Sequence, residues 1–284
     1  MSEYSIGAWE AVTPNVRIAQ LQPHGVTVGL VWGTERAVLI DAGSSPTQGA
    51  ALLSAARETA PMPVTHLVVT HPHHDHWFGA GGMAGVTLVA HEDLTTAPDP
   101  EVLAAAAGIG LIDLPAPEVT FSLVHALDLG DERVELLHFG AAHTCADVVV
   151  IVPNQDVMFL GDLIERAGDP QFGPSSDVAA WPKVVDSVLG AATESTRFVP
   201  GHGQSGGGLP GLIVDRAFCF KQRADLALIY GTAEHLVMQG VSVEQAYEAA
   251  DWPFQEETMR GALPIVYDQL AAKGVTVRKN LPLV

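Results

Sequence analysis

The chain has 284 residues, and its 33 acidic and 14 basic side chains give a formal net charge of −19 at neutral pH. This balance argues against a nucleic-acid partner, because phosphate binding requires clustered lysine and arginine. Residues 1–15 lack the basic start and the apolar run of a signal peptide, and no apolar stretch approaches the ~20 residues of a membrane span. We therefore expect neither a nucleic-acid nor a membrane partner.

The cysteine content gives an expectation about the compartment. Two cysteines, Cys145 and Cys219, are too few for a disulfide framework. Free thiols are typical of proteins in a reducing environment. We therefore expect a cytoplasmic protein that acts on a small-molecule substrate, with an acidic surplus that serves solubility.

In the first half of the chain, short β-branched and apolar runs alternate with turns and helical segments. Residues 46–59 are predicted to form a helix, because Pro46 stands at a first-turn position where its missing N–H does no harm. Residues 100–107 are predicted to be helical as well. Strands are expected at residues 16–21, 26–32, 37–40, 65–70 and 86–90.

The second half repeats the order of strands followed by a helix. Residues 119–129 and 133–139 are predicted to pair as a hairpin around the turn Gly130-Asp131. Strands followed by helices, twice over, favour an α/β fold in which two sheets are packed between helical layers. Further strands are expected at 147–152, 157–160 and 198–199, and a helix is expected at 177–192.

The character of the sequence changes after residue 205. Residues 205–211 are rich in glycine, which predicts a flexible break. We therefore divide the chain into a core of residues 1–205 and a C-terminal helical extension of residues 212–284 that packs on the core. The extension could border a cleft, make a homodimer contact or cover the core passively.

Within this extension, apolar residues keep helical spacing from Ile213 until Gly240, where the first helix is expected to stop. Ser242 and Gln245 then predict a capping box for the next helix. A third helix is expected at residues 256–272. The extension is thus predicted to be helical throughout.

The most informative segment is His71-Pro72-His73-His74-Asp75-His76, which directly follows the predicted strand 65–70. Its side chains have the order H-x-H-x-D-H and would lie at the carboxyl end of a strand, where α/β sheets form their sites. Imidazole and carboxylate together suit zinc and similar divalent ions. Neighbouring side chains of an extended loop can point apart, so this segment could serve two metal ions.

Three further motifs each deliver one ligand-type residue in a glycine-containing turn beside a short apolar strand. These residues are His143, Asp162 and His202. Glycine lets the backbone bend sharply, so the ligands can converge on one centre. Such a set exceeds the needs of one tetrahedral zinc ion and suits two metals bridged by a carboxylate. The complete set is His71, His73, Asp75, His76, His143, Asp162 and His202.

The order H-x-H-x-D-H, G-x-x-H-T, L-G-D and P-G-H-G resembles the metallo-β-lactamase superfamily of dinuclear metallohydrolases, over residues 16–205. The resemblance implies a four-layer αββα sandwich, here with a C-terminal helical appendage. It also implies two Zn²⁺ ions, with iron or manganese as alternatives that ligand type does not exclude. The implied ligands are His71, His73 and His143 for one ion, Asp75, His76 and His202 for the other, and Asp162 as the bridge between them.

The chemistry implied by the resemblance is hydrolysis by a hydroxide held between the two metals. Asp75 and Asp162 would be the catalytic residues: the first would orient the hydroxide, and the second would fix the distance between the ions. The metals would polarise the carbonyl oxygen of the substrate and hold the resulting oxyanion. His24, His91 and Glu165 are candidate proton donors to the leaving group.

Other side chains near the motifs are candidate substrate contacts. Trp77 and Phe78 could form an apolar wall beside the second metal, or they could pack under the loop. Arg166 could bind an anionic group of the substrate, or it could lie solvated at the surface. His24, in a predicted turn, is a further candidate, whereas His74 is expected to point away from the metals.

The substrate is less well defined by the sequence. Asp162 as the bridging residue resembles the glyoxalase-like thioesterases, lactonases and phosphodiesterases of the superfamily, whereas the region from His143 to Val150 is closer to β-lactamases. Glu165 would repel the carboxylate of a β-lactam. We therefore predict a hydrolase that opens a small ester, lactone or cyclic amide, with weak β-lactamase activity at most. The alternatives are a thioesterase or phosphodiesterase of the same fold, or a non-hydrolytic iron-binding oxidoreductase.

Overall fold

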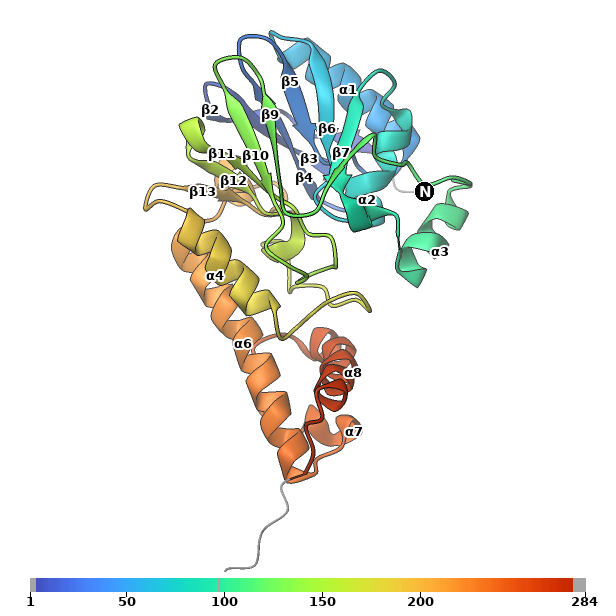
Figure 1. Cartoon of the computed structure of the whole chain (residues 1–284), viewed down its shortest axis with the longest axis vertical. Coiled ribbons are helices and arrows are strands. Elements are labelled where there is room, and N and C mark those ends of the chain that lie inside the picture. Colours follow the sequence, from blue (N-terminus) through green and yellow to red (C-terminus); the bar gives the residue numbers. More distant parts are fainter. Residues whose placement is uncertain (1–3, 97, 278–284) are drawn as a thin grey trace, which may run out of the picture.

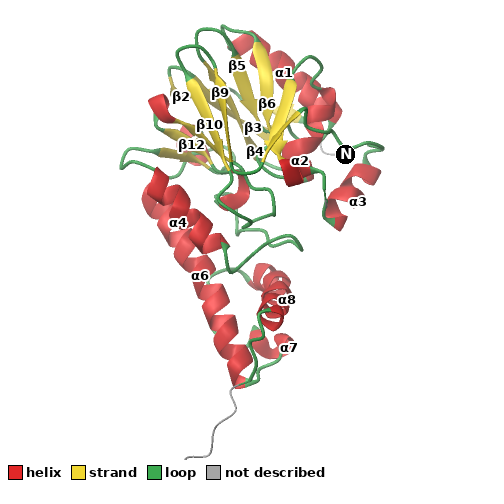
Figure 2. Cartoon of the chain, viewed as in Figure 1, coloured by secondary structure: helices red, strands yellow, loops and turns green. Residues whose placement is uncertain are grey.

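The computed structural model describes residues 4–96 and 98–277. Two β-sheets lie face to face with helices on their outer faces, and further helices extend from one end of the sandwich (Figure 1). Figure 2 shows the same layers coloured by secondary structure. The predicted α/β sandwich with helices at its C-terminus is confirmed.

The first sheet has eight strands in the order β1-β3-β4-β5-β6-β7-β8, with β2 paired to β3. Strands β3 to β5 are antiparallel, whereas β5 to β8 run parallel because helical segments connect them. The strands are β1 (Ser5–Ile6), β2 (Glu10–Thr13), β3 (Val16–Gln22), β4 (Val26–Trp32), β5 (Ala37–Ile40), β6 (Val64–Val68), β7 (Thr87–His91) and β8 (Val119–Phe121).

The second sheet has the order β13-β12-β11-β10-β9. Within the described residues, β12 and β13 run parallel, and the other neighbouring strands of this sheet run antiparallel. The strands are β9 (Val124–Asp128), β10 (Arg133–Leu137), β11 (Val149–Val152), β12 (Val157–Phe159) and β13 (Arg197–Val199).

The prediction of a single strand over residues 119–129 is wrong. In the structure β8 pairs with β7 in the first sheet, and β9 pairs with β10 in the second. A bend at Ser122 and Leu123 carries the chain from one sheet to the other. The apolar pattern continues through both strands, so it does not reveal where the chain crosses between sheets.

Three apolar layers hold the sandwich together. Val38 and Ile40 of β5 share a buried cluster with Val150 of β11 and Phe159 of β12, between the sheets. The helix α1 (Pro46–Thr59) packs on the outer face of the first sheet through residues such as Leu52. The helix α4 (Trp181–Ala191) and the start of α6 (Arg216–Gln239) cover the outer face of the second sheet. This order of layers is αββα.

Short helical segments lie in the connections. The predicted helix at 177–192 begins later, at Trp181, because a turn closed by Asp177 precedes it. The segments are α2 (His74–Trp77), η1 (Phe78–Gly82), η2 (Glu92–Leu94), α3 (Pro100–Gly108), η3 (Pro153–Gln155), η4 (Gly161–Leu163) and α5 (Leu209–Leu212).

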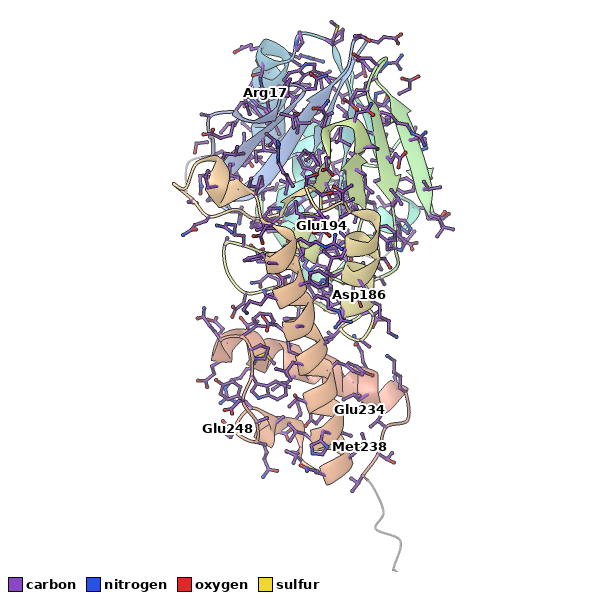
Figure 3. The ribbon with its side chains drawn as sticks, turned by 90° about the vertical axis from the view of Figure 1, so that its left-hand side faces the viewer. Arg17, Asp186, Glu194, Glu234, Met238 and Glu248 are labelled. Carbon is purple, nitrogen blue, oxygen red and sulfur yellow. The ribbon has the colours of Figure 1, made fainter. Side chains whose placement is uncertain are left out.

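The C-terminal helices are α6, α7 (Val243–Ala246) and α8 (Glu256–Ala272). The far part of α6, which carries Glu234 and Met238, packs with α7 and α8 around an apolar cluster of its own (Figure 3). Gly240 ends α6 in a left-handed conformation, as the sequence predicts. The predicted capping box is wrong, because the Ser242 side chain makes no capping hydrogen bond. None of the described helices is both long and apolar enough to cross a lipid bilayer.

Unusually close backbone packing joins α1 to the segment that follows the histidine motif. A Cβ atom on Gly79 of η1 would lie 1.9 Å from the carbonyl oxygen of Ala42. A Cβ atom on Gly49 of α1 would lie 1.8 Å from the carbonyl oxygen of Gly79. Only glycine allows this approach, so α1 fixes the position of the loop after β6.

We expect Gly79→Ala to lower the free energy of unfolding by about 1–3 kcal/mol, because the backbone must shift to admit the methyl group. Gly108→Ala, at the end of α3 where a Cβ atom meets nothing within 4 Å, is the matched control. Urea unfolding of both variants measures the difference. Equal stability of the two variants would show that the backbone contact is not restrictive.

Asp156 ties the start of β12 to the turn before β13. Its carboxylate accepts hydrogen bonds from the hydroxyl groups of Thr193, Ser195 and Thr196. Burial alone would raise the pKa of Asp156, but the hydroxyl donors outweigh it and lower the pKa below its ordinary value. The ionised carboxylate therefore stabilises the folded chain.

A carboxyl group with a lowered folded-state pKa contributes stability above its unfolded pKa of about 3.9, and this contribution is lost as the pH falls through the folded pKa. We expect Asp156→Asn to lower the free energy of unfolding by about 1 kcal/mol at pH 7 and by less at pH ~3. Asparagine tolerates the left-handed backbone at this position, where φ is 52°. Urea unfolding at the two pH values tests this, and a pH-independent difference would contradict it.

Candidate metal centre

The predicted ligand residues converge at one edge of the sandwich, although they come from four separate parts of the chain. The loop after β6 supplies His71 and His73 and then runs into α2, which carries Asp75 and His76. His143 lies in the loop between β10 and β11, Asp162 lies in η4 after β12, and His202 follows β13. The strand ends of both sheets therefore build one site.

The first group consists of His71, His73, His143 and Asp162, whose ligand-type atoms lie within 4.8 Å of one another. Nδ1 of His73 lies 3.1 Å from Nε2 of His71 and 2.9 Å from Nε2 of His143. Oδ2 of Asp162 lies 3.5 Å from each of these two Nε2 atoms. Three nitrogens and one oxygen thus surround a small buried space.

The second group consists of Asp75, His76 and His202, also within 4.8 Å of one another. Nε2 of His76 lies 3.2 Å from Nε2 of His202, which lies 3.4 Å from Oδ2 of Asp75. Asp162 reaches this group as well, with 3.3 Å from Oδ1 to Nε2 of His76 and 3.4 Å from Oδ2 to Nε2 of His202. Asp162 therefore lies between the two groups.

The outer nitrogen of four imidazole rings faces a hydrogen-bond acceptor, which assigns the ring proton to Nδ1. His143 Nδ1 donates to the carbonyl oxygen of Gln171 at 3.1 Å, and His202 Nδ1 donates to that of His24 at 2.9 Å. His76 Nδ1 donates to Asp41 Oδ2 at 2.8 Å. In a separate contact, His71 Nδ1 donates to the hydroxyl oxygen of Thr70 at 3.0 Å.

Each of these rings consequently turns Nε2 inward. The Nε2 atoms of His76 and His202 face each other, and those of His71 and His143 both face His73. Ring nitrogens this close together require a proton or a metal ion between them. Oδ1 of Asp162 is buried and has no hydrogen-bond partner among the described residues. A set of converging imidazole and carboxylate donors of this kind fits divalent metal ions.

Asp41, at the carboxyl end of β5, organises two of these rings and was not predicted as a site residue. Its carboxylate accepts hydrogen bonds from His76 Nδ1 and from both the backbone N–H and the hydroxyl of Thr70, which in turn orients His71. Asp41 is buried and adopts a left-handed backbone with φ of 64°. The only signal in the sequence was a carboxylate that ends an apolar strand, as Asp162 does.

The two groups differ in their electrostatics. Burial lowers the pKa of His73 to about 3 and lowers the pKa of His143 well below its ordinary value. Burial acts in the same direction on His76 and His202, but the nearby carboxylates, Asp162 foremost, together outweigh it and raise both pKa values, that of His202 to about 10. The rings of His73 and His143 are thus held neutral, and the second group attracts positive charge.

Local backbone features hold the loops in place. Gly201 must be glycine, because a Cβ atom there would lie 1.8 Å from Oδ1 of Asp162. Asp147 accepts hydrogen bonds from the backbone N–H and the hydroxyl of Thr144, which closes the turn that carries His143. Burial raises the pKa of Asp147 to about 6. The H-T-x-x-D pattern therefore fixes the shape of this loop.

A cavity of about 450 Å³ opens onto both groups. Its lining, all within the described residues, contains acidic side chains and imidazoles and no lysine or arginine. Of the predicted contact and proton-donor residues, His24 and Glu165 line it. Burial and Asp162 raise the pKa of Glu165 to about 8. The lining residues are His24, His73, His74, Asp75, Glu101, Val102, Asp162, Glu165, Ala167, Gly168, Asp169, Gln171 and His202.

Four other candidates lie elsewhere. Trp77 and Phe78 are fully buried in the core under α1, so the structure supports packing rather than a wall of the cavity. The guanidinium of Arg166 lies over the ring of Phe218 instead of facing the cavity lining. His91 is buried, with Nε2 donating to the carbonyl oxygen of Ser122, away from the metal groups. Local sequence order placed these residues near the motifs but did not determine where their side chains point.

The family model of the metallo-beta-lactamase superfamily matches residues 21–202, well over half of the sequence. The chain belongs to this superfamily. It is accordingly a metal-dependent hydrolase, and the resemblance predicted from the four motifs is confirmed. The matched residues end at His202, so the C-terminal helices lie outside the match.

Individual relatives agree with this assignment. A metallo-beta-lactamase type 2 from Bacteroides fragilis is 25% identical over 197 residues, which are 68% of this chain and 76% of the relative. The mono-zinc form of metallo-beta-lactamase FIM-1 from Pseudomonas aeruginosa has a TM-score of 0.61 at 22% identity, over 78% of this chain and 94% of that chain.

A further structural likeness is broader. The inverting sec-alkylsulfatase Pisa1 from Pseudomonas sp. has a TM-score of 0.72 at 18% identity, and the likeness covers 93% of this chain but 50% of that chain. It therefore extends beyond the sandwich into the C-terminal helices. At these identities, the structural likenesses establish the fold alone.

We expect Asp41→Asn to weaken binding of Zn²⁺ by about tenfold or more, because the charged acceptor that orients His76 and Thr70 is lost. Asparagine tolerates the left-handed backbone, so the fold should be kept. Competition with a chromophoric chelator measures the affinity, and Asp113→Asn at an exposed position is the control. If the folded Asp41→Asn protein bound Zn²⁺ with native affinity, the charge of Asp41 would not be needed to orient His76.

Proposed function

We propose that the chain is a dinuclear zinc hydrolase that opens small carbonyl substrates. The observation that supports this most strongly is the position of Asp162 between two groups of inward-facing ring nitrogens. Imidazole and carboxylate donors suit zinc, and the structural neighbour FIM-1 is described in a mono-zinc form. Iron or manganese could occupy the same ligands, since affinity trends do not decide occupancy in the cell.

In this proposal the first group would hold one ion and the second group the other, with Asp162 within reach of both. A bound pair of such ions supplies a water nucleophile of lowered pKa and positive charge for the carbonyl oxygen. Asp75 lines the cavity, and its buried carboxylate is placed to orient the attacking water. His24 and Glu165 also line the cavity and are the candidate proton donors to the leaving group.

The cavity favours an uncharged or cationic small molecule. Its volume of about 450 Å³ lies within the range of sites for small ligands. Glu101, Glu165 and Asp169 line it in addition to the metal-binding carboxylates, and no lysine or arginine of the described chain does so. An anionic phosphodiester would meet no lysine or arginine side chain there. Esters, lactones and cyclic amides therefore fit this lining better than phosphodiesters.

Opening of a β-lactam ring is the second candidate, and the Bacteroides fragilis relative named for that activity supports it. A β-lactam antibiotic carries a carboxylate, which the carboxylates of Glu101 and Asp169 in the lining would repel. We therefore propose at most weak β-lactamase activity. Cys145 and Cys219 are both free, which supports our proposal of a cytoplasmic enzyme.

Incubation of the zinc-loaded protein with esters, lactones, β-lactams, thioesters and phosphodiesters tests the proposal, with mass detection of the gain of one water. We expect turnover of an ester or lactone, and a loss of at least about a hundredfold in kcat/KM in Asp75→Asn. Asp268→Asn, at an exposed position of α8, is the matched control and should retain activity. Full activity in Asp75→Asn, or turnover confined to phosphodiesters, would contradict the proposal.

A further inference from the structure

A single segment, residues 163–178, lies between the metal centre and the C-terminal helices. It follows Asp162 directly and supplies several lining residues of the cavity, from Glu165 to Gln171. Within the segment, backbone or side-chain groups hold His143 from more than one side. Some contacts that fix this segment come from the core, such as the N–H of Arg166 that donates to the carbonyl oxygen of His202. Others come from α6 and α8, which lie outside the residues matched by the family model.

The first contact is made by Gln222 of α6, which is 5% exposed. Its side-chain N–H₂ donates to the carbonyl oxygen of Leu163 at 3.2 Å, and its Oε1 accepts from the backbone N–H of Glu165 at 3.1 Å. Trp181 Nε1 also donates to the carbonyl oxygen of Leu163, at 3.0 Å. One amide group thus fixes the two peptide units that follow Leu163.

The second contact is made by Gln269 of α8. Its side-chain N–H₂ donates to the carbonyl oxygen of Ser176 at 2.6 Å, and its Oε1 accepts from the backbone N–H of Val178 at 3.1 Å. The hydroxyl of Ser176 in turn donates to the carbonyl oxygen of His143 at 2.6 Å. One hydrogen-bonded chain therefore runs from α8 to the backbone of His143.

Two more contacts tie the segment to the start of α8. Oδ2 of Asp169 accepts from the backbone N–H of Gln255 at 2.8 Å and from the hydroxyl of Thr258 at 3.0 Å. The ring of Phe172 packs against that of Phe254, with centroids 6.5 Å apart. Between these anchors, the carbonyl oxygen of Gln171 accepts the ring proton of His143.

We infer that Gln222 and Gln269 are positioning residues of the metal centre, through which the C-terminal helices hold Asp162 and His143 in place. This inference rests on the proposed function in one respect, that the two groups bind metal. Each glutamine side chain forms hydrogen bonds with one backbone N–H and one backbone carbonyl group. These backbone groups lie at the end of η4 or outside the described helices and strands, so no regular hydrogen-bond pattern satisfies them. Loss of the Gln222 amide leaves the backbone N–H of Glu165 without its acceptor, and loss of the Gln269 amide releases Ser176, whose hydroxyl holds the carbonyl oxygen of His143. A small displacement of a ligand weakens a metal site.

If the C-terminal helices only cover the core, a different experimental result is expected. Passive packing depends on apolar area, so exchange of a glutamine for methionine, which has similar length and flexibility, would affect folding stability but not the metal affinity of the folded protein. A positioning role requires the amide itself. The affinity for Zn²⁺, measured on the folded full-length chain, therefore separates the two.

The test compares Gln222→Met and Gln269→Met with the native chain by competition for Zn²⁺ with a chromophoric chelator, well below the unfolding temperature. The matched control is Gln239→Met, an exposed position at the end of the same helix α6. We expect about tenfold weaker binding in each of the two variants and native binding in the control. Native affinity in both folded variants would overturn the inference.

Two further measurements keep the test decisive. Gln269→Glu keeps the acceptor for the N–H of Val178 but places a carboxylate oxygen against the carbonyl oxygen of Ser176, so it should bind Zn²⁺ more weakly than the native chain, as Gln269→Met does. The visible spectrum of the Co²⁺-loaded chain should change in Gln222→Met and not in the Gln239→Met control. If the native chain itself binds no Zn²⁺ or Co²⁺, the proposed function fails, which is a different result from equal binding in all variants.

Discussion

The rest of the site is arranged around imidazole nitrogens and carboxylate oxygens that converge within 4.8 Å of one another in each of two groups. Five imidazoles and two carboxylates meet in a buried space, and the outer nitrogens of four rings already donate to fixed acceptors. A divalent ion in each group would contact several of these inward atoms at once, which a single proton cannot do. Asp41, the carbonyl oxygens of Gln171 and His24, and the glycine at position 201 all serve this convergence.

The predicted ligands meet at one edge of the sandwich. The C-terminal helices contact the loop that follows Asp162 at this edge. Parallel strands β5 to β8 end at the same edge, and the contact between α1 and Gly79 keeps the histidine loop against the first sheet. The loop after Asp162 has no such strand to hold it, and Gln222 and Gln269 take this role. The two sheets and the C-terminal helices thus both contact the loops of the candidate metal centre.

Much of the fold and of the site could be predicted because the signals are local. The ligands from His71 to His76 lie within one loop, and Pro46 and Gly240 mark helix ends through their own backbone preferences. The features that were wrong or missed depend on distant contacts. The crossing between β8 and β9, the burial of Trp77 and the role of Asp41 are each determined by residues remote in sequence. No periodicity or motif encodes such contacts.

The measurement that tests the central claim most directly is a crystal structure of the zinc-loaded protein with anomalous data at the zinc absorption edge. Our account predicts two peaks of anomalous density, one among His71, His73 and His143 and the other among Asp75, His76 and His202, with Asp162 in contact with both. A single peak, or peaks away from these side chains, would contradict it.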